Sequence, residues 1–172
     1  QIANDEFVVT VVEVDDPPVV VNAIPDFSVL EDANDTTVDL SNVFTDVDDD
    51  NASILKVAAS SNPSVVTAKV SDNLLTVDYQ PNRSGQATIT ITANSNGQTV
   101  NDVFTVNVSE VNDVPLFTSS AVTAVIDEFP YSYLISAIDF DENDSLSITA
   151  PTLPGWLNLQ DHGAGSAKAD FS

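Results

Sequence analysis

The chain repeats part of its own sequence. Residues 4–18, NDEFVVTVVEVDDPP, match residues 101–115, NDVFTVNVSEVNDVP, at nine of fifteen positions, with an offset of 97 residues. A period of about 100 residues is the length of one Ig-like sandwich, and it is too long for ankyrin-type repeats or propeller blades. The repeat therefore predicts an array of similar domains.

A second match places the domain boundaries. After a small deletion, residues 44–51, FTDVDDDN, align with residues 137–144, AIDFDEND, so the chain samples three successive units. We expect residues 1–16 to be the last strand of a preceding repeat and residues 17–112 to be a complete repeat. Residues 113–172 are then the first part of a further, truncated repeat. Because residue 1 is not methionine, we interpret the chain as a piece of a longer precursor.

Apolar residues alternate at strand length between turn residues, which predicts β-strands. Asn96-Gly97 between two such runs predicts a hairpin. No segment longer than two turns keeps a helical period, so the predicted fold class is all-β, as tandem Greek-key β-sandwich repeats. The predicted strands of the complete repeat are Val19 to Val21, Ser53 to Ala58, Val65 to Val70, Leu74 to Tyr79, Ala87 to Ala93 and Val103 to Val108.

Composition excludes several functions. The chain has 27 acidic and four basic residues, a net charge of −23, which makes nucleic acid and anionic membranes poor partners. It has no cysteine, which excludes disulfides, thiolate metal sites and cysteine nucleophiles. No apolar run approaches the roughly 20 residues of a membrane helix, so we expect no membrane segment in this fragment.

Acidic junctions carry a family resemblance. Residues 110–117, EVNDVPLF, resemble the linker between cadherin repeats, shortened by one residue, and residues 139–141, DFD, resemble the Asp-x-Asp of the following cadherin repeat. The segment from Tyr131 to Leu157 is similar to the dystroglycan-type cadherin-like repeats of bacterial surface proteins. The middle repeat resembles the Ig/cadherin-like units of large bacterial adhesins.

This resemblance implies Ca²⁺ at both junctions. Ca²⁺ takes six to eight oxygen ligands, which one strand cannot supply alone. A linker and an Asp-x-Asp loop would supply them together, and the cation would relieve repulsion among the crowded carboxylates. The implied ligands are Glu110, Asn112 and Asp113 with Asp139 and Asp141; Glu13, Asp15 and Asp16 with Asp46 and Asp48; and Glu31 with Glu110.

Three alternatives stay open. The acidic residues can be solvated turn residues, since Asp and Asn favour turns. Paired carboxylates can hydrolyse glycosides, but the linkers give no sign of a walled pocket, so we expect no enzyme and no catalytic residue. Trp156 with Tyr131 and Tyr133 can form a platform for a sugar ring or pack in a core.

We therefore expect a calcium-binding spacer or cell-adhesion module of a secreted or cell-surface protein. The alternative is a carbohydrate-binding accessory module of a secreted polysaccharide-degrading enzyme. The expected partners are neighbouring repeats of the same chain, and another cell-surface protein or a glycan. Residues 4–14 of one chain could also complete the open sheet of another, which predicts head-to-tail self-association.

Overall fold

The computed structural model describes residues 1–124, 130–141 and 144–171. Every regular element in these described residues is a β-strand, which confirms the all-β prediction. A helix long and apolar enough to cross a membrane is not found in this part of the chain. The chain divides into two compact units, Gln1–Phe27 with Asn34–Asp78 and Gln86–Val106, and Ser28–Ala33 with Tyr79–Gly85 and Asn107–Ser172.

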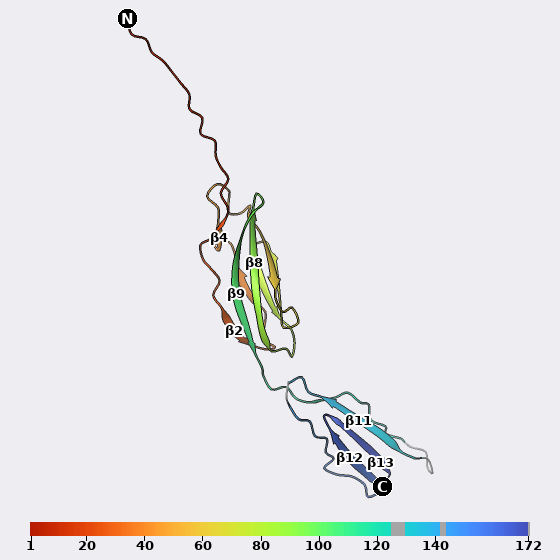
Figure 1. Ribbon diagram of the computed structural model, residues 1–172. Helices are drawn as coiled ribbons and strands as arrows, with labels where there is room; N and C mark the ends of the chain where they lie inside the picture. Colours follow the sequence, from red (N-terminus) through yellow and green to blue (C-terminus); the bar gives the residue numbers. More distant parts are fainter. Residues whose placement is uncertain (125–129, 142–143, 172) are drawn as a thin grey trace. The chain divides into compact units, whose positions relative to one another are not determined.

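The middle of the chain forms two main sheets (Figure 1). The order of the first is β2 (Phe27–Leu30), β9 (Gln98–Ser109), β8 (Gly85–Ser95) and β5 (Leu55–Ser60). The order of the second is β3 (Thr36–Asp39), β7 (Leu74–Tyr79) and β6 (Val66–Ser71), and β1 (Val19–Val20) pairs with β4 (Phe44–Thr45). The chain thus crosses between the two main sheets from β2 to β3, from β5 to β6 and from β7 to β8, as it does in an Ig-like Greek-key sandwich.

The core lies on one face of each sheet. Alternate residues of β8, among them Ile89 and Ile91, are completely buried, and so are Leu75 and Val77 on β7. Burial of each such side chain contributes about 1.5–3 kcal/mol. The period of two in the sequence therefore sets which side chains face the core and which face solvent.

Asn96 and Gly97 form the two-residue turn between β8 and β9, which confirms the predicted hairpin. Both have positive φ, at 47° and 92°, as a type I′ turn requires. The turn places Asn96 and Gln98 beside Asp15, to which both side chains donate hydrogen bonds.

The C-terminal sheet has the order β10 (Leu116–Phe117), β11 (Ser132–Ile138), β13 (Ser166–Phe171) and β12 (Leu157–Gly163). Ala167 and Ala169 on β13 are buried. β10 pairs with the end of β11, with Leu116 opposite Ile138. This pairing brings the linker before β10 next to the loop that begins at Asp139.

Residues 1–18 contain no strand, and the apolar side chains of residues 1–17, Phe7 and Val9 among them, are exposed. The expectation that residues 1–16 are the last strand of a preceding repeat therefore stays a prediction. The strands predicted for the middle repeat all overlap observed ones, and β7 has the predicted bounds.

Candidate metal centre

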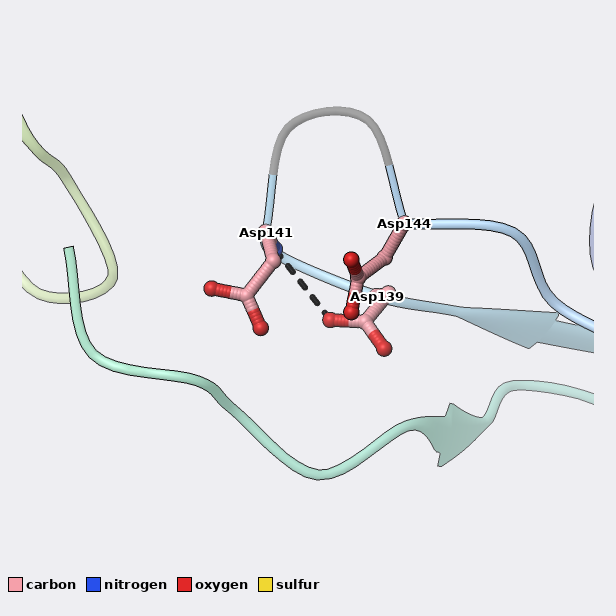
Figure 2. A group of neighbouring side chains, drawn as sticks. All are labelled: Asp139, Asp141 and Asp144. Atoms are coloured by element: carbon pink, nitrogen blue, oxygen red, sulfur yellow. Dashed lines mark hydrogen bonds between the residues drawn. The ribbon is translucent and has the colours of Figure 1, made fainter.

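Three aspartates gather at the end of β11. Asp139 and Asp141 follow the strand directly, and Asp144 comes from the far side of the same loop. One carboxylate oxygen from each lies within 4.8 Å of the others. Figure 2 shows the three side chains, with the Asp141 amide donating to Asp139 Oδ1 at 3.1 Å. This bond fixes the turn and leaves the carboxylates close together.

The linker is attached to this loop by a hydrogen bond. The Asp113 amide donates to Asp141 Oδ2 at 2.6 Å. A hollow of about 300 Å³ beside it is lined by Glu110, Asn112, Asp141 and Asp144. The linker therefore adds its own oxygen-bearing side chains to those of the loop.

A buried glutamate holds the start of the linker. Glu31 is only 6% exposed, and its Oε1 accepts a hydrogen bond from the Val111 amide at 2.7 Å. The next residue, Asp32, has a positive φ of 58° and accepts from the Asn82 amide at 3.0 Å. These contacts lie within the second compact unit.

Negative charge converges on Asp113. Burial is the largest cause that raises the pKa of its carboxyl above the ordinary value, and the charge of Asp141 is the next. The charges of Asp32, Glu31 and Asp139 raise this pKa further. Within the described residues, the buried oxygens Asp113 Oδ2 and Asp141 Oδ1 have no hydrogen-bond partner. A buried carboxylate oxygen without a partner is costly, and a cation would remove the cost.

The first junction repeats the same bonds. The Asp16 amide donates to Asp48 Oδ2 at 2.7 Å, and the Asp48 amide donates to Asp46 Oδ1 at 3.0 Å. Asp46 is 8% exposed, and no partner is found in the described part of the chain for its buried Oδ2. Asp16, Asp46 and Asp48 therefore correspond in bonding to Asp113, Asp139 and Asp141.

The two junctions differ at the residue that aligns with Asp144, the third carboxylate of the second loop. Asn51 stands where the aligned second loop has Asp144, and its Oδ1 accepts from the Asp46 amide at 2.9 Å and from Thr45 Oγ1 at 3.0 Å. An amide with one oxygen, already used by these donors, replaces the third carboxylate. The first junction is therefore the poorer site for a cation.

Amide side chains of the β8–β9 hairpin donate hydrogen bonds to the first linker. Gln98 Nε2 donates to Asp15 Oδ2 at 2.8 Å and to its backbone oxygen at 2.8 Å, and Asn96 Nδ2 donates to Asp15 Oδ1 at 3.2 Å. These hydrogen bonds, Gln98 first, lower the pKa of the Asp15 carboxyl. The Asp15 oxygens are thus engaged by the sandwich itself.

Most of the predicted ligands fall into two groups. The second junction brings together Glu31, Glu110, Asn112, Asp113, Asp139 and Asp141, and the first brings together Asp16, Asp46 and Asp48. Asp15 is held by amides, and Glu13 is exposed. Their role as metal ligands stays a prediction.

Two acidic residues were not predicted as ligands. Asp144 completes the cluster of three, and Asp32 contributes to the charge around Asp113. The alignment of Asp144 with Asn51 was a usable signal for the first. For Asp32 the only signal was its position next to Glu31.

Oxygen donors alone suit a hard cation. Thiolate and imidazole, which select zinc and copper, are absent from the cluster of Asp139, Asp141 and Asp144. Carboxylates, an Asn amide and backbone carbonyls are the ligands of Ca²⁺, which accepts irregular geometry, whereas Mg²⁺ demands a near-ideal octahedron. The arrangement therefore fits a hard cation that takes oxygen ligands.

Three aromatic residues of the C-terminal part of the chain line a separate hollow. Tyr131, Tyr133 and Phe117 line a space of about 430 Å³ with mostly apolar neighbours. Trp156 is 53% exposed, so of the two alternatives left open for it, packing in a core is wrong. Its exposure is compatible with a sugar platform.

Comparisons with known proteins show no family for this chain. The chain matches no protein-family model and no curated protein. It is similar to parts of two solved endo-fucoidan hydrolases of glycoside hydrolase family 107, MfFcnA4 at 18% identity and a TM-score of 0.45, and MfFcnA9 at 15% and 0.43. Each match covers 91% of this chain but only 24% and 30% of the enzymes. Titin domains Z1Z2 in complex with telethonin match at 9% identity and a TM-score of 0.34, over 92% of this chain and 83% of theirs.

Proposed function

We propose that this chain is a calcium-binding β-sandwich module of a larger secreted or cell-surface protein. In this proposal Asp139, Asp141 and Asp144 hold the ion together with oxygens of the linker at residues 110–113. The ion joins the linker to the loop and makes the junction stiff. The module then acts as a spacer or an adhesive repeat.

The observation that carries this proposal is the set of buried carboxylate oxygens without partners. Asp141 Oδ1 belongs to the acidic cluster and Asp113 Oδ2 to the linker that is hydrogen-bonded to it, and the first junction has such an oxygen at Asp46 Oδ2. Solvated turn residues would point their oxygens to water instead. The same bonding at two junctions 97 residues apart supports a repeated device over chance.

Calcium would act mainly on the linker. Without Ca²⁺, the hydrogen bonds donated by the backbone amides of Val111 and Asp113 hold the linker. Repulsion among the carboxylates opposes these bonds. With Ca²⁺ bound, the repulsion becomes attraction toward one centre. The resemblance to cadherin-like repeats, noted for the linker and the Asp-x-Asp loop, agrees with this mechanism.

Hydrogen exchange of the linker amides tests the proposal. Exchange at Val111 and Asp113 should slow when Ca²⁺ is added to chelator-treated protein. Leu75 in the core strand β7 is the internal control and should exchange at the same rate in both conditions. Equal exchange at Asp113 with and without Ca²⁺ would leave the acidic residues as solvated turns and would contradict the proposal.

A second candidate function rests on the exposed Trp156 and the hollow lined by Tyr131 and Tyr133. We infer a carbohydrate-binding accessory role in a secreted polysaccharide-degrading enzyme as the alternative. Aromatic faces bind sugar rings by stacking. Glycan binding that Trp156→Ala abolishes without unfolding the chain would support this role, and absence of binding to any glycan tested would remove it.

A further inference from the structure

We propose that the sheet of β5, β8 and β9 carries a weak self-association surface that binds the same surface of a second copy of this chain. The surface consists of the alternate residues that point away from the core, at 55–59, 88–94 and 99–105. We call it the outer face. It lies within the first compact unit and is separate from the proposed metal centre.

The side chains of the outer face form a continuous surface. β8 pairs with β5 in a register that sets Val57 opposite Thr92 and Leu55 opposite Asn94. On the other side β8 adjoins β9, as Figure 1 shows, and Thr92 Oγ1 donates to Asn101 Oδ1 at 2.8 Å. A threonine row thus lies between an apolar strand and a mixed strand. Leu55 is 71% exposed and Val57 is 64% exposed.

The outer face carries no charge. The eleven alternate positions are Leu, Val, Ala, Thr and Asn only, although the chain as a whole has a net charge of −23. The corresponding face of the other sheet bears Asp39, Asp78 and Lys69, all of them exposed. Neutrality is therefore a property of this sheet face and not of exposed strand residues in general.

Charge decides which partner fits. Two copies with this net charge repel each other wherever their acidic surfaces approach. They can bind through their neutral outer faces, which bury apolar and hydroxyl groups without bringing carboxylates together. A polyanionic glycan would need cationic groups, and a neutral sugar would favour an aromatic ring for stacking. The outer face has neither among its eleven residues. Two identical faces related by a two-fold axis satisfy the requirement.

The size of the outer face sets the strength of the contact. Three strands about 4.8 Å apart, each contributing about 20 Å of length, present about 300 Å² per copy. Stable complexes bury about 800 Å² per partner, so this contact is transient. Several repeats displayed on one protein would add their weak contacts and raise the avidity.

The test is a concentration series of the whole chain followed by amide NMR, in salt high enough to reduce the Debye length to about 4 Å. We expect concentration-dependent shifts on β5, β8 and β9. Val57→Glu should weaken association by at least about tenfold, because a carboxylate placed in the contact loses its hydration. Leu74→Glu, on the outer face of the other sheet, is the matched control and should associate like the parent chain.

A charge-pair experiment separates a specific contact from a damaged fold. Val57→Lys and Val57→Glu should each associate poorly alone and should associate with each other when mixed. No concentration dependence in the parent chain, or association that persists unchanged in Val57→Glu, would overturn the proposal. Shifts confined to residues 4–14 and the C-terminal sheet would indicate strand exchange and overturn it as well. Shifts on β8 caused by a neutral glucan, with no concentration dependence, would do the same.

Discussion

Asp141→Asn should weaken Ca²⁺ binding and stabilise the metal-free chain, two effects of opposite sign. Asparagine keeps an oxygen that can accept the Asp113 amide, but it removes one of three charges whose oxygens lie within 4.8 Å of one another. Simple damage to the loop would lower both Ca²⁺ affinity and stability. The opposite signs therefore distinguish a cation site from a structural hydrogen bond.

The magnitudes follow from Coulomb's law in a water-like dielectric. At 4.8 Å each carboxylate pair repels by about 0.9 kcal/mol, so removing Asp141 relieves about 2 kcal/mol over two pairs. The attraction lost between one carboxylate oxygen and a divalent ion about 2.5 Å away is about 3.3 kcal/mol, or roughly a 300-fold loss of affinity. For a chain of this size, 1 kcal/mol corresponds to about 2–4 °C in Tm.

Calorimetric titration and thermal unfolding in chelator measure these two effects. Asp78→Asn makes the same change of charge at an exposed residue of β7 and should alter neither. If Asp141→Asn binds Ca²⁺ as tightly as the parent chain, or unfolds at a lower temperature in chelator, the reasoning about the cluster is refuted.

Three further substitutions test separate parts of the account. Asn51→Asp supplies the missing third carboxylate and should add a Ca²⁺ ion or tighten binding at the first junction, as titration would reveal. Glu31→Ala leaves the Val111 amide without its acceptor and should cost about 1–3 kcal/mol in thermal unfolding, with an unchanged Tm refuting the role of that bond. Hydrogen bonds from the Gly163 amide, the larger cause, and from Ser147 Oγ lower the pKa of the Asp161 carboxyl. The ionised carboxylate therefore stabilises the fold, and this contribution is lost as the pH falls through the lowered pKa. Ser147→Ala should raise that pKa and move the loss of stability to higher pH. NMR titration of the Asp161 carboxyl measures the pKa, and an unchanged pKa in Ser147→Ala would contradict the role of this bond.

Much of the fold could be predicted because periodicity encodes it. The 97-residue offset predicted the sandwich length, and alternation predicted β7 with its observed bounds. The strands β2 and β3 were not predicted, because four residues are too few to establish a period. Short strands are defined by their neighbours in the sheet and not by local pattern.

The candidate site was partly predictable for a similar reason. Matching linkers and Asp-x-Asp loops at one period indicated that Asp113 and Asp141 lie together, and they share a hydrogen bond. The amide contacts of Asp15 could not be predicted, because Gln98 is 83 residues away and its side-chain direction depends on the hairpin. Trp156 could not be placed either, because an apolar neighbourhood in sequence does not determine burial.

Calorimetric titration of chelator-treated protein with Ca²⁺, with Mg²⁺ as the control ion, tests the central claim most directly. The account predicts saturable Ca²⁺ binding that Mg²⁺ does not reproduce and that weakens when Asp139 and Asp141 are both changed to Asn. No heat of binding at millimolar Ca²⁺, or equal binding by the doubly substituted chain, would contradict it.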